Sequence, residues 1–268
     1  MTTRFDRDTA LHPIGDGVYE GRIDPAWRII RGANGGHLAA IVLRGMLLTV
    51  ADEGRPPRAL TVYFASVPRE APVDIRATVE RSGRSVSFVS GRMEQEGKLI
   101  ATGLAAFSTA WPSPEFADLS MPEVPSPEDV EQIADRTDFP FGQHFDIRRV
   151  LGAAEPSPDA PAETGVWMRL REPQTADHIV VTQYMDAWAP AVFNKLATGG
   201  GGAGVPTIEM TCYFREPLPL PGAEPDDWYL AVFRTTTARE GFIEEDGWLW
   251  SRDGRLVAQS RQLALLMV

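Results

Sequence analysis

The alternation of apolar and polar residues predicts one buried helix and an antiparallel meander in the first half of the chain. Residues 14–30 are typical of one or two strands. The run from Leu38 to Val50 is apolar on nearly every face except at Arg44, which predicts a helix buried on most sides, and Asn34-Gly35-Gly36 supplies its start. Further strands are expected at residues 59–67, 73–81, 85–95 and 99–109.

The second half repeats this order after a linker. Residues 112–127 are rich in proline and acid and have neither helical nor strand periodicity. The pattern then predicts a strand at 166–171, a helix at 186–196, and strands at 207–214, 228–238, 241–251 and 256–267. We therefore predict a first domain at 1–110, a linker at 111–138 and a second domain at 139–268.

Two short motifs recur at nearly the same interval. Thr61-Val62-Tyr63-Phe64 is matched 150 residues later by Thr211-Cys212-Tyr213-Phe214. Gly97-Lys98-Leu99-Ile100-Ala101 is matched 157 residues later by Gly254-Arg255-Leu256-Val257-Ala258. A duplicated module is the simplest interpretation. Pairing the two copies into one continuous sheet would cover an exposed edge on each.

Composition narrows the function classes. The chain has 268 residues, 43% of them hydrophobic, which is enough for a folded core, and a formal charge of −11, which argues against general nucleic-acid binding. No apolar stretch reaches the roughly 20 residues of a membrane span, and the acidic N-terminus lacks the apolar core of a secretory signal, so we expect a cytoplasmic location. Cys212 is the single cysteine and is expected to be a buried thiol. The four histidines lack ligand-like spacing, so no metal site is expected.

Several segments together resemble a known family. They are Asn34-Gly35-Gly36 before an apolar helix, Arg81-Ser82-Gly83-Arg84-Ser85, Gln95-Glu96-Gly97 with Ile100-Ala101, and the terminal Leu256-Val257-Ala258-Gln259-Ser260-Arg261-Gln262. Their order and spacing resemble the type II, double-hotdog acyl-CoA thioesterases over nearly the whole chain. The resemblance implies an α+β tandem hotdog, in which a long curved antiparallel sheet wraps around two central helices. It also favours association into a homo-oligomer.

The same resemblance implies a reaction and its residues. The reaction is hydrolysis of a fatty or other acyl-CoA to free acid and CoA by activated water, with CoA as part of the substrate and no other cofactor. In the family an Asp at the start of the second hotdog helix, a Thr or Ser on the next strand and a Gln on the last strand hold that water. These positions match Asp186, Thr207 and Gln262, with Thr211 as the alternative hydroxyl.

Each of these residues also has a purely structural interpretation. Asp186 could be a helix N-cap, Thr207 a β-former at the start of a strand, and Gln262 a solvent-facing amide. Predicted substrate-binding residues are the helix-start residues Asn34, Gly35, Gly36 and His37 and the turn residues Arg81 and Arg84, which could meet CoA phosphates. His37 could instead be structural, and the arginines could simply be solvated.

The repeat predicts unequal modules. Aligning the copies puts Ala105 opposite Gln262 and Pro57 opposite Thr207, with Asn34 or Gly35 near the position of Asp186. We therefore expect one working site per chain, or a site where the halves meet. Two alternatives stay open: a hotdog hydratase or dehydratase, which would need an Asp–His pair, and a non-catalytic acyl-thioester binding protein.

Overall fold

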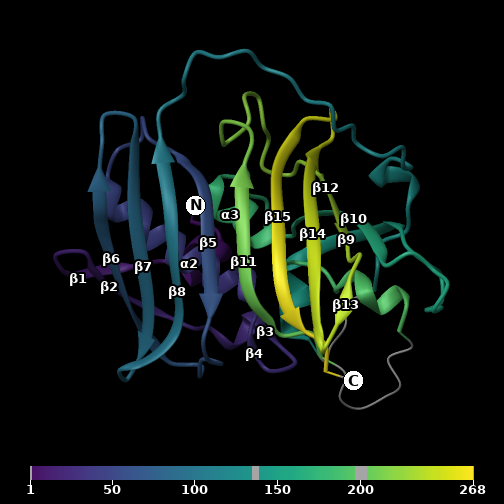
Figure 1. Cartoon of the computed structure of the whole chain (residues 1–268), viewed down its shortest axis with the longest axis horizontal. Coiled ribbons are helices and arrows are strands. Elements are labelled where there is room, and N and C mark those ends of the chain that lie inside the picture. The colour runs from purple at the N-terminus through teal and green to yellow at the C-terminus, as the bar shows by residue number, and fades with distance from the viewer. Residues whose placement is uncertain (1, 135–138, 197–203, 268) are drawn as a thin grey trace.

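The computed structural model describes residues 2–134, 139–196 and 204–267, and one antiparallel sheet dominates it (Figure 1). Most strands follow one another across the sheet in the order β1 (His12–Gly15), β2 (Val18–Arg22), β6 (Pro72–Ser82), β7 (Val86–Gln95), β8 (Lys98–Ser108), β5 (Pro57–Phe64), β11 (Thr207–Phe214), β15 (Leu256–Leu265), β14 (Phe242–Ser251), β12 (Tyr229–Arg234), β10 (Glu163–Leu170) and β9 (Phe145–Leu151). The short strand β13 (Ala238–Arg239) pairs beside β14, and β3 (Arg28–Ile29) and β4 (Gly32–Ala33) form a separate ribbon. The predicted tandem hotdog is confirmed.

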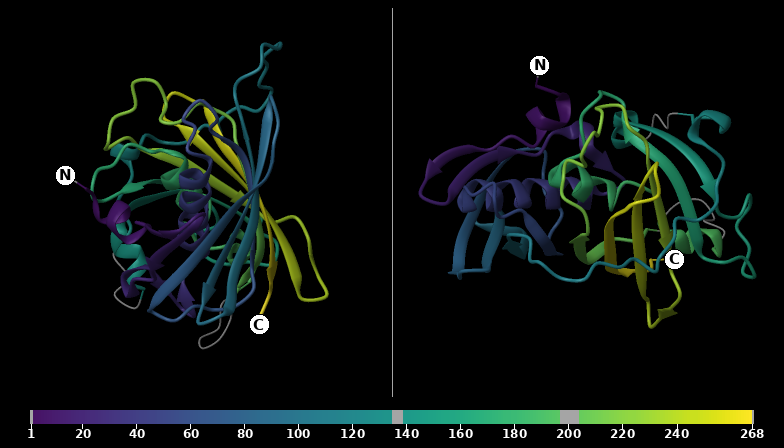
Figure 2. Two further views of the ribbon diagram at one scale, coloured as in Figure 1. Left: turned by 90° about the vertical axis from the view of Figure 1, so that its left-hand side faces the viewer. Right: turned by 90° about the horizontal axis from the view of Figure 1, so that it is seen from above.

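The helices lie on one face of this sheet (Figure 2). They are α1 (Arg4–Asp8), α2 (Gly35–Val50) and α3 (His178–Tyr184). The chain also forms the 3-10 turns η1 (Pro25–Trp27), η2 (Pro127–Asp129), η3 (Pro140–His144) and η4 (Ala191–Asn194). Helix α2 begins where the sequence indicates, because the Asn34 side chain accepts the N–H of His37. Apolar side chains of α2 and of the inner sheet face form a core that extends through both modules.

The predicted second helix at 186–196 is wrong. The helix lies earlier in the chain, at His178–Tyr184, and its N-cap is Asp177, which accepts from the N–H groups of Ile179 and Val180. Pro190 disfavours a helical conformation at the residue before it, so the apolar run after Asp186 cannot continue as one α-helix. Asp186 therefore follows α3 instead of beginning it.

The two modules join along β5 and β11. Thr61 lies directly opposite Thr211, and their hydroxyl oxygens are 2.9 Å apart. Leu60 pairs with Cys212 and Val62 with Met210, and these pairings are related by exchange of the two copies. The junction therefore contains an approximate two-fold axis, as a duplicated module predicts.

Both central strands carry a β-bulge near their first residue. In β5 the register shifts between Pro57 and Ala59, and in β11 it shifts between Thr207 and Glu209. A bulge changes the face toward which the preceding side chain points. Thr207 consequently lies on the inner face, opposite the buried Ala264.

The segment between the modules is consistent with a linker. No helix or strand occurs in residues 109–126, and Figure 1 shows this segment passing over the ends of the central strands. The boundaries 111–138 stay a prediction, and residues 135–138 lie outside the described part. Within the described ranges, no helix has the length and apolarity needed to cross a membrane.

Candidate active site

The carboxyl group of Asp186 lies at the point where the end of α3 meets the start of α2. Its Oδ2 accepts from the N–H of Gly36 at 2.7 Å and from Nδ2 of Asn34 at 3.0 Å. The same Nδ2 donates to the backbone oxygen of Asp186 at 2.8 Å. Asp186 is therefore not the N-cap of α3, as one interpretation of the sequence suggested, but an acceptor for the first turn of α2.

Gln262 connects Asp186 to Thr207. Its Nε2 donates to Oδ1 of Asp186 and to the backbone oxygen of Met185, both at 3.3 Å, and its Oε1 accepts from Oγ1 of Thr207 at 2.8 Å. Gln262 is only 5% exposed, so the solvent-facing alternative is wrong. The structure thus brings the three predicted catalytic residues into one hydrogen-bonded chain.

The bulge in β11 distinguishes the two candidate hydroxyls. Because of it, Thr207 faces the interior beside Gln262. Thr211 contacts Thr61 and donates to Oε1 of Glu209 at 2.6 Å, away from Asp186. Strict alternation would have put both threonines on the same face, so the hydrogen bond to Gln262 favours Thr207.

Asn34, Gly35 and Gly36 lie at the site, where they contact Asp186. Oδ1 of Asn34 accepts from Nε2 of Gln183 at 2.8 Å, which fixes the amide whose Nδ2 holds Asp186. A Cβ on Gly36 would lie 2.9 Å from the backbone oxygen of Gln183, and one on Gly35 would lie 2.9 Å from Oδ2 of Asp186. Glycine therefore permits the close approach of the two helices here. Direct substrate contacts by these three residues stay a prediction.

Burial controls the basicity of Asp186. It raises the pKa of this carboxyl to about 6, against the opposing effect of hydrogen bonds from Gly36, Gln262 and Asn34. Asp186 nevertheless keeps partial solvent exposure. The group is thus mostly ionised at pH 7 while being more basic than an ordinary aspartate.

A second buried acid, Glu245, was missed in the sequence. It lies on β14 directly opposite Gln262, is 8% exposed, and accepts the N–H of Ala191 at 2.6 Å through Oε2. Burial raises its pKa to about 8, and the charge of Asp186 contributes. A signal existed, because Glu245 shares its strand face with buried Ile243 and Leu249.

His37 does not line the site. It is 0% exposed, and its ring stacks on Trp27 with the ring centroids 4.5 Å apart. Burial lowers its pKa to about 3, so it is neutral. Its predicted substrate contact is therefore not supported, and the structural interpretation applies.

The structure also does not bring Arg81 and Arg84 to Asp186. They flank the turn between β6 and β7, where Arg55 donates to the backbone oxygens of Gly83 and Arg84. Arg55 follows the C-terminus of α2, whereas Asp186 lies at its N-terminus. A helix of 16 residues separates these ends by about 24 Å.

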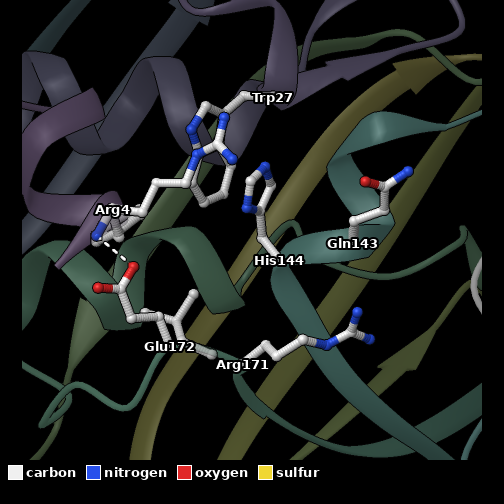
Figure 3. A pocket seen from close by; sticks show the side chains of 8 residues that line it. Arg4, Trp27, Gln143, His144, Arg171 and Glu172 are labelled. Carbon is white, nitrogen blue, oxygen red and sulfur yellow. Dashed lines mark hydrogen bonds between the residues drawn. The ribbon is translucent and has the colours of Figure 1, made fainter.

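A separate pocket of about 190 Å³ lies beside α1 (Figure 3). It is lined by Arg4, Phe5, Trp27, Gln143, His144, Leu170, Arg171 and Glu172. The Arg4 side chain donates to Asp8, its backbone N–H donates to Glu172, and Arg171 donates to Asp146. The guanidinium groups of Arg4 and Arg171 in this pocket are thus already paired with acidic side chains. None of the residues that line the pocket belongs to the Thr207–Gln262–Asp186 chain.

The register supports the predicted alignment of the strands in the two modules. Ala105 pairs with Leu60 as Gln262 pairs with Met210. Pro57 pairs with Phe107 as Thr207 pairs with Ala264. The first module therefore has alanine and proline where the second has the amide and the hydroxyl.

One part of the alignment is wrong. The counterpart of Asn34 is Asp177, because each is the N-cap of its module's helix. Asn34 and Asp186 are instead neighbours in space, contributed by different modules. The polar site is therefore built where the halves meet.

Neither a histidine partner nor a metal-binding cluster accompanies Asp186 in the parts of the chain that the structure describes. His12 is exposed, Nε2 of His144 contacts the backbone oxygen of Ala26, and the ring of His178 lies against Phe214. The same residues include no group of three or more His, Cys, Asp or Glu side chains placed to hold a metal. Cys212 is a buried free thiol, as predicted, and burial raises its pKa.

Comparisons with known proteins agree with this architecture. The profile of the acyl-CoA thioesterase N-terminal domain matches residues 23–108, and that of the acyl-CoA thioesterase C-terminal domain matches residues 120–266. A conserved protein of unknown function with a hot dog fold from Alicyclobacillus acidocaldarius has a TM-score of 0.90 and 28% identity, covering 100% of this chain and 99% of its own.

Two further solved structures are similar over almost their full length. A proposed thioesterase II from Thermobifida fusca YX has a TM-score of 0.83 and 26% identity, covering 100% of this chain and 98% of its own. An acyl-CoA thioesterase II from Mycobacterium marinum has a TM-score of 0.79 and 22% identity, covering 98% of each chain. At the latter identity the likeness concerns the fold alone.

Proposed function

Because the chain belongs to the acyl-CoA thioesterase family, we propose that it hydrolyses an acyl-CoA thioester with a water molecule activated by Asp186. The observation that carries this proposal is the hydrogen-bonded chain from Thr207 through Gln262 to Asp186. It joins a hydroxyl, an amide and a carboxylate of raised pKa at a partly exposed position. These are the groups needed to deprotonate and orient a water molecule.

The proposed step begins with proton transfer from water to Asp186. The hydroxide oxygen bonds to the thioester carbonyl carbon, the carbon–sulfur bond of the resulting intermediate breaks, and the CoA thiolate leaves. The protonated Asp186 carboxyl then donates its proton to the thiolate and returns to its ionised form. A pKa of about 6 suits both proton transfers, because Asp186 is ionised at pH 7 and can accept a proton from water, and its protonated carboxyl can then donate that proton to the thiolate.

Gln262 and Thr207 orient the base and its water in this proposal. The Gln262 amide is fixed at both ends, with Nε2 toward Asp186 and Oε1 toward Thr207. Thr207 uses its proton in the bond to Gln262, so the lone pairs of its oxygen remain available to accept from a water molecule. The acyl-chain length, the pathway and the cellular location are not part of this proposal.

The test is thiol release from short-, medium- and long-chain acyl-CoAs by the full chain and by Asp186→Asn. Loss of the general base should lower kcat by about 10²- to 10⁴-fold. Thr207→Val should also lower kcat, because the hydrogen bond to Gln262 is lost. Thr211→Val is the matched control, on the same strand but facing away from Asp186, and should leave kcat near the wild-type value.

Circular dichroism and thermal melting must show that each variant is folded. Undiminished turnover by Asp186→Asn would exclude Asp186 as the base. Binding of acyl-CoA without turnover by the wild-type protein at any chain length would instead favour the non-catalytic binding protein.

A further inference from the structure

Glu245 lies next to the proposed catalytic chain but is not a member of it. Its backbone pairs with that of Gln262 across β14 and β15, and both side chains are buried. Oε2 of Glu245 accepts the N–H of Ala191, the first residue of η4, at 2.6 Å. The side chain therefore links the segment that follows Asp186 to the strand beside Gln262.

The bonding of Glu245 differs from that of Asp186. Among the described residues, its carboxyl has the N–H of Ala191 as its one hydrogen-bond donor, and no donor reaches Oε1. Asp186 has donors on both oxygens, from Gly36 and Asn34 on one and Gln262 on the other. A buried carboxyl with few donors is more stable as the neutral acid.

The pKa values of Glu245 and Asp186 also differ. Desolvation is the largest cause that raises the pKa of Glu245 to about 8, and the negative charges of Asp186 and of Glu244 on its own strand add to it. Because the pKa of Asp186 is raised only to about 6, Asp186 ionises first. Desolvation, together with the charge of Asp186, then keeps Glu245 protonated around pH 7.

The first module shows that the hotdog scaffold does not need an acid at this position. Val89 pairs with Ala105 as Glu245 pairs with Gln262, so Val89 is the counterpart of Glu245. Val89 is fully buried in the core. The acid occurs only in the module that also has the amide and the hydroxyl.

We propose that Glu245 is a positioning residue, which fixes the turn carrying Asp186 against Gln262 by holding Ala191. The inference rests on the proposed thioesterase function and adds to it a residue that neither the family resemblance nor the comparisons assign. As a neutral acid Glu245 holds the turn without placing a second negative charge beside Asp186. Once ionised at higher pH, it repels Asp186 and disturbs that turn.

The experiment compares pH profiles of kcat and KM for the wild type, Glu245→Gln, Glu245→Ala and the control Glu244→Gln. Glu244 is the adjacent acid on the other face of β14, where it accepts from Thr236 and Thr237. In the wild type kcat should decline above about pH 8. Glu245→Gln, whose amide oxygen can still accept from Ala191, should keep kcat at pH 7 and lose that decline.

Glu245→Ala removes the anchor and should lower kcat about tenfold or more with a much smaller change in KM, as expected when an interaction of the transition state is lost. Glu244→Gln should match the wild type in kcat at pH 7 and should keep the high-pH decline, shifted toward lower pH because the charge of Glu244 helps to raise the pKa of Glu245. An unchanged decline at high pH in Glu245→Gln, or an unchanged kcat in Glu245→Ala, would overturn the proposal.

A second measurement tests the titration of Glu245 without using activity. The folded protein retains a proton on Glu245 between pH 4.5 and about 8 that the unfolded chain releases, so this group reduces stability as pH rises through that window. The Tm of Glu245→Gln should therefore fall less than that of the wild type between pH 5 and pH 8. Parallel Tm curves would refute the buried neutral acid, whereas absent turnover with diverging curves would refute only the thioesterase function.

Discussion

At the scale of single residues, Asp186 illustrates a competition between desolvation and hydrogen bonding. Gly36, Asn34 and Gln262 all donate to its carboxyl, and such bonds stabilise the ionised form. Burial opposes them and prevails, so the pKa rises to about 6. The result is a carboxylate that is fixed in place and still basic enough to take a proton from water.

This balance predicts the acidic side of the pH profile. Since Asp186 must be ionised to act as the base, kcat/KM should increase with pH through a midpoint near 6 and fall about tenfold per unit well below it. Initial rates of thiol release between pH 4.5 and pH 7.5 measure this midpoint. A midpoint near 4, the ordinary value for aspartate, would contradict the assignment.

At the scale of elements, the contact between α2 and the end of α3 depends on the absence of a side chain at Gly36. An alanine Cβ there would lie 2.9 Å from the backbone oxygen of Gln183 and 3.0 Å from Cβ of Asp186. Alanine gains up to about 1 kcal/mol in helix propensity over glycine, but overpacking costs about 1 to 3 kcal/mol. The steric term should therefore dominate.

We expect Gly36→Ala to lower the free energy of unfolding by up to about 2 kcal/mol, the difference between those effects, and to reduce kcat by displacing Asp186. Urea unfolding and thiol release measure the two effects. Gly142→Ala is a suitable control, because no atom lies within 4 Å of its added Cβ. A fully stable and active Gly36→Ala protein would mean that the helices separate without cost.

The elements differ in how well the sequence predicts them. Strands such as Thr207–Phe214 and the helix Gly35–Val50 have a clear period, breaks and caps, so they were predicted within a few residues. Helix α3 was misplaced because its seven residues, all buried, show no amphipathic period, while the apolar run after Asp186 resembles a helix. The predicted strands at 14–30 likewise proved to be several short elements.

The sequence predicts those parts of the site that depend on the type of residue at a position. It does not predict those that depend on strand register or on packing between the modules. Gln262 stood out as an amide in an apolar run, and burial bears this out. The inward orientation of Thr207 depends on a bulge that alternation does not reveal. The contact between Asn34 and Asp186 joins residues far apart in the chain, so it required the packing of both modules.

At the scale of the whole molecule, one module supplies the proposed base and the other holds it. Asp186, Thr207 and Gln262 come from the second copy, while Asn34 and Gly36 come from the first. The contact between the halves is therefore part of the site as well as part of the fold.

Asn34→Ser tests this dependence in the full chain. Serine can still cap α2 through its hydroxyl, but it lacks the amide that donates to Asp186. Loss of that donor should raise the midpoint of the kcat/KM profile above that of the wild type. The Tm should also fall, although the cap is kept, because the buried Nε2 of Gln183 loses its acceptor. A changed Tm with an unchanged midpoint would indicate that Asn34 serves only the helix.

Asp186 lies beside the N-terminus of α2, and this position affects how the base would be regenerated in the proposed cycle. The aligned peptide dipoles of a helix give its N-terminus a partial positive charge of about half an elementary unit. In the proposed cycle, that end of the helix loses its counter-charge when Asp186 takes up a proton from water, so the helix dipole disfavours the protonated form and opposes the burial that favours it. In that cycle, delivery of the proton to the departing thiolate would restore the charge pairing, and the dipole of α2 would favour regeneration of the base after each turnover.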